Sequence, residues 1–120
     1  MEKIYLDNAA TTPLRKEVVA EIASVLSDHF GNPSSSHSFG RSAKNSMESS
    51  RKRIAKLLGT SASEIIFTSS ATEATNWILT SAVKDLGIKR IITTKIEHHA
   101  TLHTVEHLAK EFGIQVEYIT

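Results

Sequence analysis

The sequence predicts an α/β protein with a mostly parallel sheet and flanking helices, and three observations carry this prediction. From residue 64 onward, three short apolar segments alternate with two segments of helical periodicity. Glycines stand where the helical patterns end, at Gly59, Gly87 and Gly113. A strand–helix–strand–helix–strand order implies crossover connections and therefore parallel strands. The hydrophobic fraction of 40% is enough for a packed core.

The expected elements follow one another along the chain. A short extended segment at 4–6 and a polar loop at 7–13 come first. Val18, Ile22, Val25 and Leu26 recur at helical spacing, which predicts a helix that begins just after Pro13. After a serine-rich loop, a second helix is expected over about 38–58, with Gly59 at its C′ position. Strands are expected at 64–68, 90–94 and 114–119, with helices at 72–84 and 100–111.

In open α/β sheets, ligands bind at the carboxyl ends of the strands. The residues of interest are therefore those just after Thr68, Thr94 and Ile119. The sequence stops at the third of these positions, and its apolar strands would keep an uncovered edge. We therefore expect the 120 residues to be part of a longer domain.

Composition and charge exclude several classes of function. Fourteen basic and 13 acidic residues are interspersed, so no basic patch predicts nucleic-acid binding. There is no long apolar run and no signal-peptide core, so we expect no membrane association and a cytoplasmic location. The chain has no cysteine, which excludes disulfides, thiolate metal sites and a cysteine nucleophile within these residues.

A possible phosphate site lies at residues 69–73 (SSATE), between an expected strand and an expected helix. The first N–H groups of a helix are unpaired and carry the positive end of its dipole, and a threonine hydroxyl adds a donor. The same residues also read as a capping box, with Ser70 as N-cap and Glu73 at N3. The pattern alone favours plain capping, and phosphate binding stays the alternative.

A histidine pair follows the next strand, in residues 94–99 (TKIEHH). A histidine at this place can stack on an aromatic cofactor or transfer protons near neutral pH. It can equally be a surface histidine or a helix cap. Position alone does not choose between these readings.

Residues 103–107 (HTVEH) match the H-x-x-E-H zinc signature, and His99, His103 and His107 form a stripe at helical spacing. The apolar residues of the same helix fall on roughly the opposite side. The stripe is therefore interpreted as a solvated face, and we expect no metal site.

Taken together, several motifs resemble the class V aminotransferase family and, within it, the cysteine desulfurases. Their order and spacing make the set specific, although each motif is weak alone. One departure is Ser70, which stands where the family usually has glycine. The matching segments are 5–13 (YLDNAATTP), 30–35 (FGNPSS) with His37 and Gly40, 64–69 (EIIFTS), 71–74 (ATEA) with Asn76, and 97–98 (EH) with Ala100.

The resemblance implies a fold type I pyridoxal 5′-phosphate (PLP) enzyme that is normally a homodimer. Such an enzyme takes sulfur from L-cysteine, releases alanine, and leaves a persulfide on a catalytic cysteine, to supply iron–sulfur clusters or thio-cofactors through an acceptor or scaffold protein. By this similarity, Ala71 and Thr72 hold the PLP phosphate. His98 stacks on the pyridine ring and assists proton transfer. The loops at 8–12 and 32–37, with Asn8, Thr11, Asn32 and His37, border the active site.

The resemblance covers roughly the first third of such an enzyme. Residues 1–13 would be an N-terminal loop segment near the active site, and 14–120 the start of the PLP-binding large domain. The family's Schiff-base lysine, pyridine-binding aspartate, persulfide cysteine and carboxylate-binding arginine come later in the chain, so these residues alone are expected to be inactive. Two alternatives stay open: another class V enzyme such as a selenocysteine lyase, or a non-catalytic truncated binding module.

Overall fold

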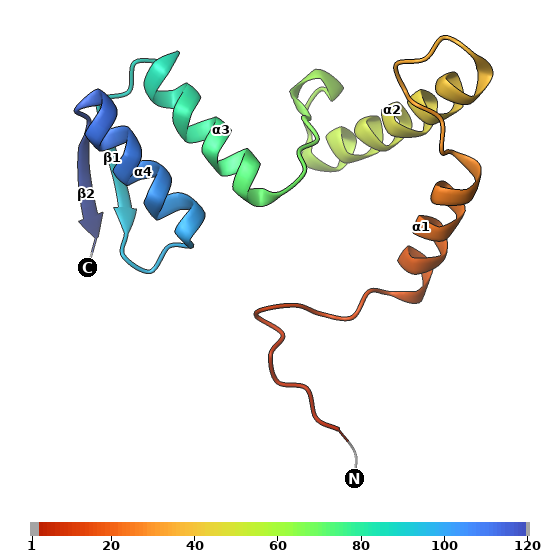
Figure 1. The fold of residues 1–120 in the computed structure, drawn as a ribbon, viewed down its shortest axis with the longest axis horizontal. Helices are drawn as coiled ribbons and strands as arrows, with labels where there is room; N and C mark the ends of the chain where they lie inside the picture. The colour runs from red at the N-terminus through yellow and green to blue at the C-terminus, as the bar shows by residue number, and fades with distance from the viewer. Residues whose placement is uncertain (1–2, 120) are drawn as a thin grey trace. The chain divides into compact units, whose positions relative to one another are not determined.

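The computed structural model describes residues 3–119, which form two compact units, one ending at Ile65 and one beginning at Ile66. The second unit is an α/β arrangement of a parallel strand pair with flanking helices, which confirms the predicted fold class (Figure 1). The first unit contains α1 (Lys16–Asp28), α2 (Ser38–Leu58) and the 3₁₀ helix η1 (Ala62–Glu64); the second contains α3 (Ala71–Lys84), β1 (Arg90–Thr94), α4 (His99–Phe112) and β2 (Gln115–Ile119).

The strand pair of the second unit is parallel, with Arg90 opposite Gln115 and Thr94 opposite Ile119. Parallel neighbours need a long crossover connection, and α4 provides it between β1 and β2. The core of this unit comprises Val83 of α3, Leu108 of α4 and Ile114, all at least 94% buried, with partly buried residues of both strands packed against them. The sheet therefore buries one face against helices, as α/β architecture requires.

The prediction of a strand at 64–68 is wrong. Glu64 ends η1, Ile65 has extended backbone angles of φ −94° and ψ 120°, and the strands formed by residues 3–119 are β1 and β2. The Ile65 carbonyl accepts a hydrogen bond from the Arg51 side chain instead of from a neighbouring strand. Ile66 and Phe67 are 59% and 45% exposed. An apolar, β-branched segment becomes a strand only where a neighbouring strand supplies the hydrogen-bonded ladder, and the described residues form such a ladder between β1 and β2.

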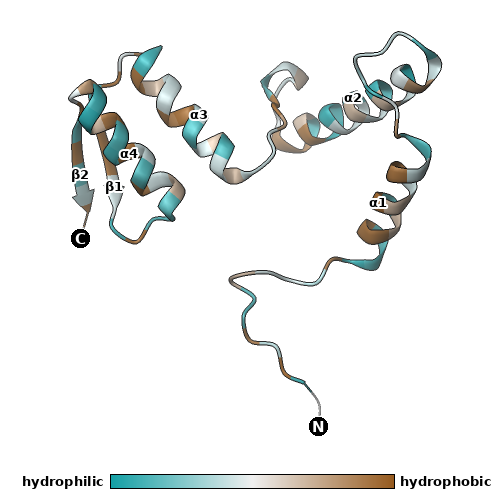
Figure 2. Ribbon diagram, in the orientation of Figure 1, coloured by the Kyte–Doolittle hydropathy of each residue, from teal (hydrophilic) through white to brown (hydrophobic). Residues whose placement is uncertain are grey.

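Helix α1 begins at Lys16, slightly later than predicted from Pro13, and its N-cap Arg15 makes no side-chain capping bond. None of its residues is buried. Figure 2 shows apolar residues along this helix. Of the stripe predicted from the sequence, Val18, Ile22 and Leu26 are at least 42% exposed, whereas Val25 is half-buried. The helical periodicity therefore identified an apolar face that the first unit covers only in part.

Helix α2 spans the predicted residues, and its capping groups are well defined. The His37 ring nitrogen accepts from the Gly40 N–H at 3.4 Å at the start of the helix. Gly59 has φ +68° at its end, the left-handed conformation expected of a C′ glycine. This is the longest helix of residues 3–119, and neither it nor any other helix there is apolar enough over a sufficient length to cross a membrane.

The loop between α1 and α2 packs tightly on the start of α2. Phe30 contacts Phe39 with ring centroids 5.5 Å apart, and the His29 ring lies 3.0 Å from the Ser42 hydroxyl. Gly40 is buried, and a Cβ there would lie 2.3 Å from the Ser35 carbonyl oxygen. Such a distance is far inside van der Waals contact, so any side chain at this position must displace the loop at 32–35.

Replacing Gly40 with alanine should therefore destabilise the protein by about 1–3 kcal/mol, the usual cost of overpacking. The change in unfolding free energy is measured by urea denaturation. Ser49→Ala, at an exposed site of the same helix, is the matched control and should change stability by less than about 0.5 kcal/mol. Equal stabilities of the two variants would contradict the close contact.

Candidate functional site

A cleft of about 280 Å³ lies in the second unit, where the starts of α3 and α4 meet. The three residues singled out from the sequence, Ala71, Thr72 and His98, all line it. The structure thus brings together two segments that are about 25 positions apart in the sequence. The remaining lining residues are Thr75, Ala100 and Thr101.

The start of α3 is capped by Ser70, as predicted. The Ser70 side-chain oxygen accepts from the Glu73 N–H at 3.2 Å. The expected return bond of the capping box is displaced by one residue: the Glu73 carboxylate accepts from the Ser69 hydroxyl at 2.7 Å and the Ser69 N–H at 2.6 Å. These two bonds, the hydroxyl first, lower the pKa of Glu73 below its usual range. The carboxylate is thereby held at Ser69, where two donors are available instead of one.

This capping leaves a set of donors at the cleft. Of the first four N–H groups of α3, that of Glu73 bonds to the Ser70 side chain and that of Ala74 to the Ser70 carbonyl. Among residues 3–119, the N–H groups of Ala71 and Thr72 have no hydrogen-bond acceptor, as is usual for the first positions of a helix. With the Thr72 hydroxyl and the positive end of the helix dipole, they suit an anion such as phosphate.

His98 is the N-cap of α4. Its Nδ1 accepts from the Ala100 N–H at 3.1 Å, with backbone angles of φ −61° and ψ 146°. A nitrogen that accepts a hydrogen bond carries no hydrogen, so the neutral ring bears its hydrogen on Nε2. The two readings left open by the sequence are therefore compatible: this histidine caps a helix and also lines the cleft.

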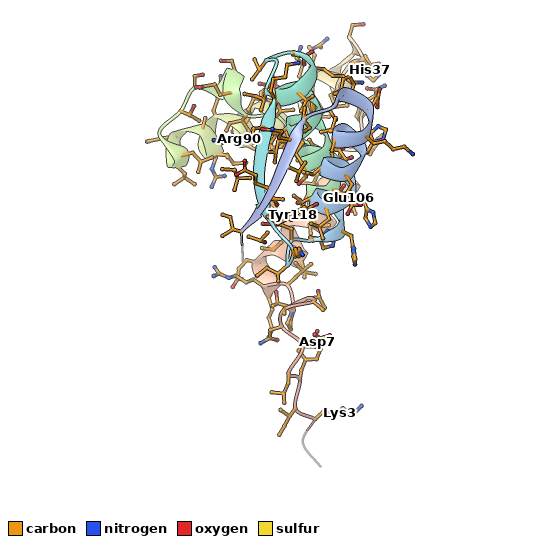
Figure 3. The ribbon with its side chains drawn as sticks, turned by 90° about the vertical axis from the view of Figure 1, so that its left-hand side faces the viewer. Lys3, Asp7, His37, Arg90, Glu106 and Tyr118 are labelled. Atoms are coloured by element: carbon orange, nitrogen blue, oxygen red, sulfur yellow. The ribbon has the colours of Figure 1, made fainter. Side chains whose placement is uncertain are left out.

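His99 does not line the cleft. Its ring stacks on His103, with centroids 5.4 Å apart and an interplanar angle of 27°. His107 pairs with Glu111 at 2.7 Å, and these side chains lie on the exposed side of α4, opposite buried Val105. Figure 3 shows Glu106 on this outer side. The stripe is a solvated face, as interpreted from the sequence, and no three metal-ligating side chains converge in the described part of the chain.

The two polar loops of the first unit, at 7–13 and 32–37, are stabilised by local hydrogen bonds. The Tyr5 hydroxyl lies within hydrogen-bond distance of the carbonyl oxygens of Asp7, at 2.9 Å, and Thr11, at 3.1 Å. The Asn32 side chain accepts from the Ser34 N–H at 2.9 Å, which forms an Asx turn. These bonds give both loops local structure, and their place beside an active site stays a prediction.

Sequence reasoning missed Thr75 and Thr101 as lining residues of the cleft. Both could have been found, because each lies three positions after a predicted site residue, Thr72 and His98. Residues three apart on a helix share a face.

Comparison with known proteins identifies the family. The family model described as aminotransferase class-V matches residues 4–120. The chain is 48% identical to the putative cysteine desulfurase IscS 1 of Bacillus subtilis (strain 168), covering 99% of this chain and 32% of that protein. It is 44% identical to the cysteine desulfurase IscS of Dictyoglomus turgidum, covering 98% and 30%.

Solved structures agree with the sequence comparisons. A NifS-like protein superposes with a TM-score of 0.89 at 42% identity, covering 98% of this chain and 33% of that one. SspA in complex with cysteine superposes with a TM-score of 0.79 at 38% identity, covering 93% and 33%. The chain therefore spans about a third of the length of these relatives.

The capping bond of His98 makes a prediction about stability. His98→Ala should lower the unfolding free energy of the cofactor-free protein by about 1 kcal/mol, because the Ala100 N–H loses its acceptor. His98→Asn should cost clearly less, since asparagine is a preferred N-cap residue. Chemical denaturation of the two variants beside the wild type checks the ranking, and equal stabilities would show that the cap contributes nothing.

Proposed function

The chain belongs to the class-V aminotransferase family, and on that premise we propose that it forms the first third of a PLP-dependent cysteine desulfurase. The observation that carries this proposal is the cleft at the starts of α3 and α4, lined by Ala71, Thr72 and His98. The names of the relatives support it, because several of them are called cysteine desulfurases.

The residues of the cleft fit PLP, which has a phosphate and a flat aromatic ring. The unpaired N–H groups of Ala71 and Thr72 match the phosphate, and the imidazole of His98 matches the ring. A volume of about 280 Å³ is at the lower end for ligand sites, which suits a cleft with one wall still to be supplied by the rest of the protein. When bound, PLP supplies an aldehyde that reacts with amines and a pyridinium ring that accepts electrons.

Thr72 is proposed as the phosphate anchor. Its N–H, its hydroxyl and the N–H of Ala71 would converge on the dianion, and the helix dipole adds to the attraction. Charge-assisted hydrogen bonds are about twice as strong as neutral ones. The phosphate would therefore set the position of the whole cofactor.

His98 is proposed to stack on the cofactor ring. The Ala100 N–H holds Nδ1 and so fixes the orientation of the ring before any ligand binds. One imidazole face can then lie against an aromatic ring, while the Nε2 hydrogen remains to be donated. The proposed proton transfer takes place at Nε2, which is the nitrogen that the capping bond leaves free.

The proposed substrate is L-cysteine, which is converted to L-alanine while its sulfur passes to an enzyme cysteine and then to an acceptor or scaffold protein, for iron–sulfur clusters or thio-cofactors. One structural relative, SspA, was solved in complex with cysteine, which supports this choice. The 120 residues contain no cysteine, so the sulfur-accepting thiol must come from elsewhere in the protein. We also propose that the whole protein is a homodimer located in the cytoplasm.

The function is tested by expressing the full gene and the 120-residue chain separately. We expect the full-length protein to release sulfide and alanine from L-cysteine with PLP, and the 120-residue chain to give no more than free PLP does. Catalysis with this cofactor needs a Schiff-base lysine and a thiol. No lysine of these residues matches the family's Schiff-base position, and no cysteine is present. If the protein turns over selenocysteine but not cysteine, it is a selenocysteine lyase. If it turns over neither substrate, the desulfurase proposal is wrong and a non-catalytic binding module is favoured.

Thr72→Val should weaken PLP binding by the full-length protein about ten- to a hundredfold. The substitution keeps the shape of the side chain and removes a charge-assisted donor worth about 1.5–3 kcal/mol. Deoxypyridoxine phosphate, which lacks the aldehyde, is the probe, because it binds only through non-covalent contacts. Thr80→Val, further along α3 and not among the lining residues of the cleft, is the control and should leave the affinity unchanged. Unchanged affinity of the Thr72 variant would reject the anchor.

His98→Asn should change the absorbance of bound PLP and lower turnover by about a hundred- to ten-thousandfold, the range for general acid–base catalysis. Asparagine retains the helix cap, so this variant separates the loss of the ring from loss of stability. His99→Asn is the matched control and should do little, because that ring lies on the exposed side of α4 beside His103. The reverse ranking of the two variants would show that the assignment is wrong.

A further inference from the structure

A polar connection joins α3 to α4 in the second turn of each helix. The hydroxyl oxygen of Thr104, a residue only 6% exposed, lies 2.7 Å from Asn76 Oδ1 and 2.7 Å from the Ala100 carbonyl oxygen. The side-chain nitrogen of Asn76 donates to the Thr72 carbonyl oxygen at 2.8 Å. A buried threonine of one helix and an asparagine of the other thus connect two cleft residues, Thr72 and Ala100.

The direction of each bond is determined by its partners. The Thr72 carbonyl can only accept, so the amide nitrogen of Asn76 must face it and Oδ1 must face Thr104. The Thr104 hydroxyl must then donate, and its one hydrogen is shared between Asn76 Oδ1 and the Ala100 carbonyl. Inverting the Asn76 amide would place two acceptors against each other. The network therefore has one arrangement, and it needs the Thr104 hydroxyl.

The network reaches the two groups that the proposed function uses. At one end is Thr72, the proposed phosphate anchor. At the other end is Ala100, whose N–H donates to His98 Nδ1 while its carbonyl lies at the Thr104 hydroxyl. A continuous series of hydrogen bonds therefore runs from the His98 ring to the backbone of Thr72.

Apolar packing alone does not set the spacing of the two helix starts. Of the buried apolar side chains of these helices, Val83 and Leu108 lie further along, away from the cleft, and Val105 lies next to Thr104. Near the cleft the facing residues are small, such as Ala71 and Ala100. Apolar contact has no preferred direction, whereas a hydrogen bond fixes the rotation and translation of one helix relative to the other.

We propose that Asn76 and Thr104 are positioning residues that hold the phosphate-binding start of α3 at a fixed distance from His98 at the start of α4. This inference rests on the proposed function, because it assumes that one ligand contacts both helix starts. Neither side chain lines the cleft, so both act through Thr72, Ala100 and His98. Misplacement by even about 1 Å at such a site can cost on the order of a hundredfold.

The test compares Thr104→Val, which keeps the shape and removes the hydroxyl, with Thr104→Ser, which keeps the hydroxyl, in the full-length protein. Two readouts are measured: affinity for deoxypyridoxine phosphate, and visible circular dichroism of bound PLP. We expect Thr104→Val to bind about tenfold or more weakly with an altered dichroism signal, and Thr104→Ser to stay within about twofold of wild type. Wild-type affinity and dichroism in Thr104→Val would overturn the proposal.

A second comparison separates positioning from general stability. Leu79→Ala removes a side chain packed on the core of the same helix pair, so it should lower stability while leaving the dichroism signal unchanged. A dichroism change in Leu79→Ala equal to that in Thr104→Val would overturn the proposal, because it would follow from stability alone. If Thr104→Val does not fold, Asn76→Ala at an exposed position takes its place with the same expected outcome.

The proposed function can fail separately from the positioning role. If the wild-type protein binds neither deoxypyridoxine phosphate nor PLP, the proposed function is wrong, and the positioning proposal fails with it. If the wild type binds both and the Thr104 variants bind equally well, only the positioning proposal is wrong.

Discussion

The parallel pairing of β1 with β2 is the constraint on which the rest of the second unit depends. Two parallel strands need a crossover, and α4 provides it within 20 residues, from Lys95 to Ile114. The helix must therefore begin beside the carboxyl end of β1 and return to the amino end of β2. This path places His98 at the carboxyl edge of the sheet, where α/β proteins bind ligands. The position of His98 therefore follows from the direction of the chain, whatever the chemistry of its side chain.

The chemistry of the candidate site comes from two helix starts that are capped differently. At α3, Ser70 accepts from the N–H groups of Glu73 and Ala74, and those of Ala71 and Thr72 have no acceptor among residues 3–119. At α4, the His98 side chain is itself the cap. One start thus offers donors for an anion, and the other offers a flat ring with a fixed orientation. A ligand with both a phosphate and an aromatic ring matches this combination better than either group alone.

Exposed apolar surface is the other general property of both units. Ile66 is 59% exposed, Ile92 on the strand face is 54% exposed, and α1 has no buried residue. Within each unit, a contiguous patch formed by such side chains would be expected at an interface or beneath further chain. The relatives are about three times as long as these 120 residues, so additional chain is available in that family to cover such faces. The short apolar segment at 65–68 is consistent with this view, since Ile66 and Phe67 are 59% and 45% exposed.

Local signals in the sequence were enough to predict three features: α2 with Gly59 at its end, the Ser70 cap of α3, and the exposed side of α4. Helical periodicity and capping depend on residues within a few positions of each other, so they can be read without a fold. The motifs likewise identified the family and the three residues that meet in the cleft. Only the tertiary structure decided that 64–68 is not a strand, because a strand requires a partner distant in sequence. It alone also brought Thr104 to Asn76, 28 positions away, since no local pattern encodes a contact between two helices.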